Sequence, residues 1–372
     1  MNEHAVSIVI DGKEIGGWTE YTVTTSITDP VDTFAMRMPW SRDAWRLLAP
    51  DRPVRILIDD VPMVTGFIDE RELPMDEEVI SITGRDRCGR LVQESAPAID
   101  YRGLGIRELV GRLASPWFTV VTLSNARNRR VLRGRGKRAG AGNEPVKLNT
   151  RVGTRLEPGQ TRWAVIEDLL GQAGYLAWSA GDGAELILGR PNYDQEVQFH
   201  FRRPAPGGQS GNVLGLGVKH STADRYSRIL VLGSGGGTDA SYGLPVAARV
   251  GEAKDNPRTA DGEGRDFSAP KRLIIADEAI VSRAEADAFA RREMARRNSG
   301  GLLVSVRAPL HGQLVAGRAR TLFCPDVLVR VDDEVTGTAG VFLITSCSYR
   351  SSRGEGETTT LELVPRGTEL SA

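Results

Sequence analysis

The chain has 372 residues, of which 40% are hydrophobic and 26% charged, and its formal net charge at pH 7 is zero. This is the composition of soluble globular domains, with room for two or three of them, and it excludes a global electrostatic attraction to nucleic acid or membrane surfaces. Aromatic residues make up only 6% while 42 residues are Gly, which favours many strands and turns over a large α/β core.

The three cysteines, Cys88, Cys324 and Cys347, lie far apart in the sequence. They form neither a zinc signature nor a disulfide framework, which suits a reducing cytoplasm. The N-terminus shows no basic start followed by a long apolar stretch, so we expect no signal peptide. No apolar run approaches the ~18 residues of a membrane-spanning helix. We therefore expect the protein to be made and folded in the cytosol, without membrane insertion.

Residues 1–95 show the pattern of short strands. Asp11-Gly12 separates two apolar runs, and residues 54–68 (VRILIDDVPMVTGFI) place an Asp-Asp turn between an alternating strand and a second apolar strand. Turn signals recur every ~8–12 residues, a spacing typical of a small antiparallel barrel or sandwich.

Residues 96–210 differ, because helical patterns enter. GIRELVGRLA predicts a short helix, and RWAVIEDLLGQAG predicts a longer one in which Gly174 occupies the C-terminal cap. The following stretch, YLAWSAGDGAELILGRP, predicts a hairpin that turns at residues 181–183. We expect a small mixed α+β domain here, followed by a linker.

Strands resume in residues 211–372. This third part contains a Gly- and Asp-rich insertion at about 236–270 and a predicted helix at about 282–298. Ser282 and Glu285 form a capping box at the start of that helix, and Gly300 ends it. Four further strand patterns complete the chain.

Residues 327–344 (VLVRVDDEVTGTAGVFLI) repeat the hairpin of residues 54–68. Ahead of the two hairpins, VTTSITDPVDTFAMRMP also resembles VKHSTADRYSRILVLG. Two copies of one barrel in a single chain would explain this collinear order. The alternative is chance, because alternating strands resemble one another.

Patterns that would indicate catalysis, a metal or a cofactor are weak. GSGGG at 233–237 lacks the Gly-Lys-Ser/Thr ending of a phosphate-binding loop, and the four histidines show no metal-ligand spacing. No GxSxG motif occurs, and the paired carboxylates lie in predicted turns, where Asp has a backbone role. We predict no catalytic, metal or cofactor-binding residues, and a protein that is not an enzyme.

Two groups of basic residues allow more than one interpretation. Residues 127–138 carry seven basic side chains in twelve positions and suit a solvated loop, an acidic partner surface or nucleic acid. Arg291, Arg292 and Arg296 crowd the C-terminal half of the predicted helix. They either complement the helix dipole or, as our candidate interface residues, contact another subunit.

The remaining candidate residues are structural. Gly12, Gly66 and Gly84 are expected at tight turns or close backbone approaches. Trp18 and Phe34 are expected in the core of the first barrel.

Several segments carry a family resemblance that covers most of the chain in the right order. GGWTEYTVTTSITDPVDTFAMRMP, VRILIDDVPMVTGFIDE and ITGRDRCGRLVQESA resemble the N-terminal domain of the P-type baseplate hub proteins of Mu-like contractile-tailed bacteriophages. RWAVIEDLLGQAGYLAW resembles the middle domain of that family. RYSRILVLGSGG, the Arg-rich helix and LVRVDD with the strands after it resemble its last domain.

The resemblance implies a mainly β fold with two tube-like antiparallel β-barrel domains, residues 1–95 and 211–372, and a small α+β domain at 96–210. It further implies a homotrimer in the virion tail baseplate, assembled in the cytoplasm of the bacterial host. Such a hub joins the hexameric tail tube to the trimeric central spike. Its other partners would be baseplate wedge proteins, the tape-measure protein, and DNA in transit through the channel.

The sequence allows other functions. The hub of an R-type tailocin or a related injection machine would share the same physical features. A tail-associated cell-wall hydrolase is a rival class, but the His and acidic residues show no catalytic arrangement. A carbohydrate-binding β protein is another, but its aromatic pockets would need more aromatic residues than this chain has.

Overall fold

The computed structural model describes residues 4–75, 78–97, 104–124, 159–208, 210–233, 249–255, 271–277, 280, 282–299, 301–314, 320–352 and 354–370. The basic stretch at 127–138 lies outside these ranges, and only residues 249–255 of the predicted insertion lie inside them. The chain forms two compact units. Unit 1 comprises residues 1–218 and 304–366, and unit 2 comprises residues 219–303 and 367–372.

The fold is mainly β with some α-helix, as predicted, and its largest sheet has 13 strands. The first set of strands is β1 (Val6–Ile10), β2 (Lys13–Ile15), β3 (Glu20–Ser26), β4 (Thr33–Pro39), β5 (Pro53–Ile58), β6 (Val61–Glu72) and β7 (Val79–Asp86). The second set is β11 (Phe199–Arg203), β12 (Gly215–His220), β16 (Leu302–Pro309), β19 (Leu328–Asp333), β20 (Thr338–Ser352) and β21 (Gly356–Pro365). A short hairpin, β17 (Gly312–Leu314) and β18 (Arg320–Leu322), follows β16.

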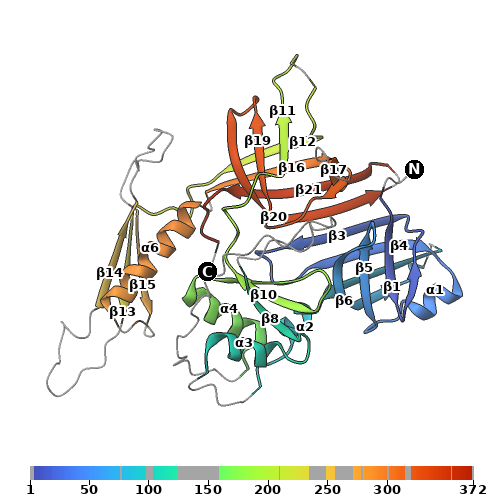
Figure 1. The fold of residues 1–372 in the computed structure, drawn as a ribbon, viewed down its shortest axis with the longest axis horizontal. Helices are drawn as coiled ribbons and strands as arrows, with labels where there is room; N and C mark the ends of the chain where they lie inside the picture. Colours follow the sequence, from blue (N-terminus) through green and yellow to red (C-terminus); the bar gives the residue numbers. More distant parts are fainter. Residues whose placement is uncertain are drawn as a thin grey trace. The chain divides into compact units, whose positions relative to one another are not determined.

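The two sets have the same order across the sheet. In the first the order is β3-β4-β7-β6-β5-β1, and in the second it is β12-β16-β21-β20-β19-β11. One pair differs in direction, since β1 runs antiparallel to β5 while β11 runs parallel to β19. We call these two sets repeat 1 and repeat 2. In Figure 1, repeat 1 appears in blue, and β16, β19, β20 and β21 of repeat 2 appear in orange to red.

Local sequence explains the hairpins of repeat 1. Asp59 and Asp60 connect β5 to β6 with φ angles of 49° and 59°, the left-handed backbone that a two-residue hairpin turn requires and that Asp tolerates. Asp11 and Gly12 do the same between β1 and β2, with φ angles of 49° and 76°. Both predicted turns are therefore confirmed.

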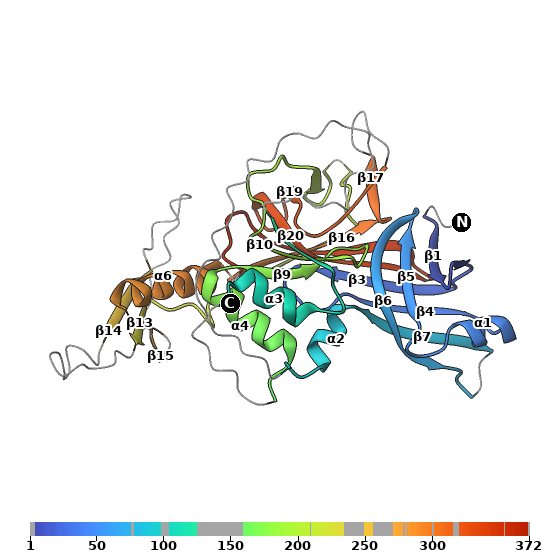
Figure 2. The same ribbon diagram turned by 60° about the horizontal axis from the view of Figure 1, so that its bottom comes forward.

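The middle part of the chain packs helices on a small sheet, as Figure 2 shows. Its elements are α2 (Cys88–Gln93), α3 (Ile106–Ala114), β8 (Val120–Ser124), α4 (Arg162–Ala173), β9 (Leu176–Ser179) and β10 (Glu185–Gly189). The predicted helices and hairpin are present, and Gly174 caps α4 with a φ of 70°. A separate short helix, α1 (Arg42–Leu47), begins at the cap residue Ser41.

Unit 2 is a three-stranded sheet covered on one face by a helix. It contains β13 (Arg228–Gly233), β14 (Arg249–Lys254), β15 (Arg272–Asp277) and α6 (Arg283–Ser299). The predicted capping box is confirmed, because the Ser282 Oγ accepts from the Glu285 N–H and the Glu285 carboxylate accepts from the Ser282 N–H. Small apolar side chains of α6, Ala286 and Ala290, pack on Ile229 and Val231 of the sheet.

The internal match predicted ahead of the two hairpins was partly wrong. We matched the strand of residues 33–39 with RILVLG, which forms β13 in the separate sheet of unit 2. The structure places β16 in that position, because β4 pairs with β7 and β16 pairs with β21. Both candidate strands alternate in the same way, so only their pairing partners distinguish them.

Candidate assembly interface

The two repeats correspond residue by residue around their longest strands. In β6 the register against β7 shifts between Ile68 and Glu70, and in β20 the register against β21 shifts between Ile344 and Ser346. Such a bulge bends a strand at a defined point, so Ile68 and Ile344 mark the same position in the two repeats.

The segment before each hairpin repeats the same hydrogen bonds. The N–H of Asp51 donates to the carbonyl of Ile68 at 2.8 Å, and the N–H of Asp326 donates to the carbonyl of Ile344 at 2.9 Å. Asp51 and Asp326 also share a left-handed backbone, with φ angles of 65° and 61°. Agreement in the bulge, the hydrogen bond and the φ angle identifies a structural duplication.

Strands β3 and β20 join the repeats edge to edge, and we call this contact the seam. The two strands run antiparallel, from Ser346 opposite Ser26 to Ser351 opposite Tyr21, and lie side by side in Figure 1. The Oγ atoms of Thr24 and Ser348 approach to 3.2 Å across the seam. On the inward face, Val23 meets Tyr349, and both are fully buried.

The edge of β20 serves two partners in succession. Its first part pairs with β19 as far as Leu343, and its part beyond the bulge pairs with β3. In repeat 1, β5 occupies the first part of the edge of β6 and its register ends at Phe67. Among the described residues, β6 beyond Ile68 pairs with β7 alone, so the place that β3 fills on β20 is open on β6.

Strand β12 is the counterpart of β3 and ends the main path of the large sheet, where it pairs with β16. Among the residues that the structure describes, nine large hydrophobic side chains are exposed, and three of them lie beside the two open edges. Leu73 is 41% exposed and Met75 fully exposed just after β6, and Leu214 is 59% exposed just before β12. Exposed apolar side chains at an unpaired strand edge are typical of a surface that pairs with another chain.

A buried polar cluster lies beside the seam and ties residues before β1 to repeat 2. The Nε2 of His311 lies 2.7 Å from the Tyr21 hydroxyl, and the Nδ1 of His311 lies 2.9 Å from the Thr359 hydroxyl. The rings of His4 and His311 stack with centroids 5.1 Å apart. The sequence prediction missed this pair, because 307 residues separate the two histidines and no local motif joins them.

The histidines of this cluster have a full set of protein partners. The His4 Nε2 accepts from the His311 N–H at 3.3 Å, so the His4 Nδ1 carries the proton and donates to Asp59 at 2.6 Å. Burial, together with the neighbouring His4, lowers the pKa of His311 to about 3, which keeps its imidazole neutral near pH 7. Burial also raises the pKa of Tyr21 well above its ordinary value. Because all four ring nitrogens form hydrogen bonds with protein atoms, the cluster stabilises the contact between β3 and repeat 2.

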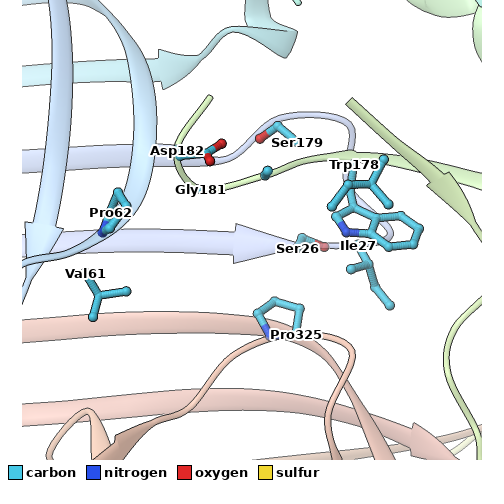
Figure 3. A pocket seen from close by; sticks show the side chains of 11 residues that line it. Ser26, Ile27, Val61, Pro62, Trp178, Ser179, Gly181, Asp182 and Pro325 are labelled. Atoms are coloured by element: carbon cyan, nitrogen blue, oxygen red, sulfur yellow. The ribbon is translucent and has the colours of Figure 1, made fainter. Parts of the chain in front are cut away.

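A small pocket of about 90 Å³ opens where repeat 1, the middle part and repeat 2 meet within unit 1. Figure 3 shows Ser26 and Ile27 at the end of β3, Trp178 and Asp182 of the β9–β10 hairpin, and Pro325. Ligand pockets typically enclose ~300–1,000 Å³, so this space is small for a ligand. The nearby contacts are structural, since the Ser179 hydroxyl donates to the buried Asp86 at 2.5 Å.

The predicted structural residues occupy turns, close contacts and the core. Gly12 lies in the turn between β1 and β2, while Trp18 and Phe34 are 8% and 2% exposed. A Cβ on Gly66 would lie 1.9 Å from the Arg85 carbonyl oxygen. A Cβ on Gly84 would lie 2.3 Å from both the Phe34 ring and the Phe67 carbonyl oxygen.

The three candidate interface arginines lie on α6 in unit 2. Arg291 is exposed, and the Arg292 guanidinium lies 5.9 Å from the Phe289 ring centre. Arg296 makes two 2.8 Å hydrogen bonds to the buried carboxylate of Glu293. Arg296 is therefore partly committed within its own helix, and a contact of the three with another subunit stays a prediction.

The described residues show neither a metal site nor a membrane-spanning helix. No group of three or more His, Cys, Asp or Glu side chains in these residues is arranged to hold a metal ion. Among the helices that the structure describes, none is both long and apolar enough to cross a membrane.

Comparisons with known proteins find similarity to phage tail and baseplate proteins. Residues 5–86 match the family described as Mu phage baseplate assembly protein GpP-like, N-terminal. The sequence matches no curated protein.

Solved structures extend the similarity to the rest of the chain. A tail protein from Neisseria meningitidis MC58 superposes with a TM-score of 0.78 at 22% identity, covering 99% of this chain and 98% of that one. The 43 kDa tail protein of prophage MuSo2 from Shewanella oneidensis gives a TM-score of 0.74 at 19% identity, covering 98% and 99%. A component of the E. coli type VI secretion system gives 0.53 at 10% identity, covering 98% and 78%.

Proposed function

We propose that this chain is a structural baseplate hub of a contractile tail. Its residues 5–86 match the Mu phage baseplate assembly family, and its fold is that of phage tail proteins. The hub is a homotrimer that joins a hexameric tail tube to a trimeric central spike. Its channel passes DNA and the tape-measure protein, and its outer surface meets baseplate wedge proteins.

The observation that carries this proposal is the duplication within one chain. Two repeats with the same strand order stand edge to edge in one sheet, joined by the pairing of β3 with β20. Three such chains in a closed ring would present six similar repeats and three identical chains. A ring of this kind matches a sixfold partner on one side and a threefold partner on the other, because symmetric interfaces need matching operators.

The buried cluster favours a structural role over catalysis. His4 and His311 bond to protein atoms through both ring nitrogens, so neither lone pair is available to activate a substrate or water. A hydrolase that uses a histidine as its general base would need such a lone pair, and His4 and His311 do not offer one. The formal net charge of zero also suits a channel that passes DNA, since each Lys or Arg contact with a phosphate adds affinity.

One comparison favours a related alternative. The E. coli type VI secretion component with a similar fold is described as structurally similar to T4 bacteriophage tail proteins gp27 and gp5. The hub of a tailocin or another injection machine would need the same symmetry match. The genes beside this one, with or without capsid genes, would separate a phage from such a machine.

The proposal is tested by measuring the solution mass of the purified 40.4 kDa chain with light scattering after size exclusion. We expect a mass three times that of the chain at high concentration or, with a co-expressed spike protein, a complex that contains three copies of the chain. A chain that stays monomeric both alone and with the spike protein would overturn the trimeric hub.

A further inference from the structure

The open edges of β6 and β12 correspond to the edges of β20 and β3, which pair with each other inside the chain. We propose that β12 of one copy pairs with the free part of β6 of the next copy, in the register that β3 and β20 use within a chain. This inference rests on the proposed hub and names the strands through which its copies meet.

The acceptor position follows from the duplication of β6 and β20. Their bulges at Ile68 and Ile344 align residue 70 with residue 346, and the strands continue in step as far as Glu72, where β6 ends and which corresponds to Ser348. The N–H of Ile27 donates to the carbonyl of Thr345 at 3.0 Å, directly at the bulge of β20. Asp69 holds the corresponding place on β6, between Ile68 and Glu70, and its carbonyl is the expected acceptor for the next copy.

The donor position follows from the duplication of β3 and β12. Against β4, Glu20 lies opposite Arg37 and Thr22 opposite Ala35. In repeat 2, a Cβ on Gly215 would lie 3.9 Å from the Cβ of Arg307, and one on Gly217 would lie 4.0 Å from the Cβ of Ser305. Arg37 and Arg307 are equivalent, since each stands two residues before the proline that ends its strand. Residue 20 therefore corresponds to residue 215.

Together, these two alignments predict which residues of β6 in one copy lie opposite which residues of β12 in the next copy. Within β6 the expected pairs are Glu70 with Ser221, Arg71 with His220, and Glu72 with Lys219. The inference also requires β6 to extend past its end at Glu72 when the copies meet, which adds Leu73 with Val218, Pro74 with Gly217, and Met75 with Leu216.

The chemistry of the pairs matches the two faces of the seam. On the inward face of the seam, Tyr349 meets Val23 and Ser351 meets Tyr21, all of them buried. The expected counterparts pair Leu73 with Val218 and Met75 with Leu216, so the exposed apolar side chains just after β6 gain apolar partners. Arg71 and His220 complete that face, with the Arg71 guanidinium stacked 3.6 Å from the Trp45 ring centre.

On the opposite face of the seam the side chains are polar, as in Thr24 with Ser348. Its expected counterpart brings the exposed Glu72 against the exposed Lys219, a pair of opposite charges on directly opposed strands. Because donor and acceptor strands differ, the contact is head-to-tail and adds copies in one direction until the ring closes.

Disulfide cross-linking tests the register directly. The three native cysteines are buried, so paired cysteines at Glu72→Cys and Lys219→Cys are the accessible thiols. Opposed residues on antiparallel strands have Cα atoms ~4.5–5.5 Å apart, within the range of a disulfide. We expect mild oxidation to convert the assembled double variant into covalent oligomers that reach three copies and stop, as read on a non-reducing gel.

Two control variants test whether cross-linking depends on the predicted register. Thr24→Cys with Ser348→Cys occupies the equivalent pair inside one chain and is expected to give a disulfide-bonded monomer. Glu72→Cys with Val218→Cys shifts the register by one residue to the other face of β12 and is expected to cross-link at least tenfold less. Equal cross-linking of the shifted pair, or none at Glu72 and Lys219, would overturn the inference.

Charge reversal at Glu72 and Lys219 tests the same pair through the strength of assembly, without oxidation. Glu72→Lys is expected to weaken assembly by at least about tenfold, because it sets like charges opposite each other at every contact of the ring. Glu72→Lys with Lys219→Glu is expected to restore assembly, whereas a double variant no better than the single one would contradict the pairing.

The outcomes separate this inference from the hub itself. A trimer in light scattering that gives no cross-link at Glu72 and Lys219 keeps the hub and overturns this interface. Cross-linked ladders that extend past three copies keep the interface and overturn the threefold hub.

Discussion

Gly84 is a residue whose missing side chain lets three strands approach. Its Cβ position lies 2.3 Å from the Phe34 ring and from the Phe67 carbonyl oxygen, and backbone oxygen cannot move without breaking the sheet. We expect Gly84→Ala to lower the free energy of unfolding by about 3 kcal/mol, the upper range for overpacking a core. Thermal or urea unfolding measures this change.

Gly354→Ala is the matched control, because a Cβ there meets nothing within 4 Å. The control is expected to change stability by less than ~0.5 kcal/mol. Equal unfolding midpoints for the two variants would show that β4, β6 and β7 do not approach as closely as described.

Asp326 makes the stability of repeat 2 depend on pH. Burial raises the pKa of its carboxyl from the ordinary 3.8 to about 7, although its Oδ1 accepts from the Asn192 N–H. The folded state therefore holds a proton that the unfolded state loses above pH 4, so Asp326 costs stability increasingly as the pH rises from about 4 to 7.

Asp326→Asn retains the oxygen acceptor and the tolerance for a φ of 61° but removes the charge. We expect the variant to be more stable than the wild type at pH 8 and to lose most of that advantage at pH 5, measured by urea unfolding at both pH values. An advantage of equal size at both would show that the carboxyl does not titrate in this window.

At the scale of single residues, the sequence predicts what local chemistry determines. Asp59 and Asp60 form the expected turn because Asp tolerates the left-handed backbone in any fold. The stacked His4 and His311 could not be found in this way, since only the pairing of distant strands brings them together.

At the scale of elements, the seam depends on a neutral His311. Burial and His4 lower the pKa of His311 from 6.5 to about 3, so its contribution to stability is complete above pH 6.5 and is lost as the pH falls toward 3. We expect acidification from pH 7 to pH 4 to cost the wild type about 1–3 kcal/mol more than His311→Gln, whose side chain does not titrate.

The comparison must be made between the two proteins at each pH, because Asp326 changes stability in the opposite direction over much of the same range. Urea unfolding at pH 7 and pH 4 gives the four values. An identical loss in wild type and His311→Gln would mean that His311 is not desolvated in the folded protein.

Elements with their own signals were predictable. The helix of residues 283–299 has a capping box, and α4 ends at a glycine with a φ of 70°. The neighbours of a strand were less predictable, since RILVLG and LLVSVRAP alternate equally well and only tertiary pairing assigns the first to unit 2 and the second to repeat 2.

At the scale of the whole molecule, α6 offers a second predicted contact between copies. Charge reversal of Arg291, Arg292 and Arg296 is expected to weaken oligomerisation without unfolding the strands, by removing a basic surface from unit 2. Light scattering gives the mass and circular dichroism the fold. An unchanged oligomer mass would contradict this contact.

A narrower variant separates the interface from the helix itself. Arg296 is bonded to Glu293, so its reversal also disturbs α6, whereas Arg291→Glu changes an exposed side chain. If only variants that include Arg296 alter the mass, the cause is the helix and not a subunit contact.

The seam between β3 and β20 also has a consequence for how such a ring would be assembled. Because both strands belong to one chain, their effective local concentration is fixed by the connection and does not depend on expression level. Half of the contacts in a six-repeat ring would then form during folding, and only three would require encounters between molecules. The same connection would also fix the order of repeats around the proposed ring. Every second position would carry repeat 2, whose strands β12 and β16 are separated in sequence by residues 221–301, nearly all of unit 2. A single gene would then give a sixfold ring a threefold set of additional domains.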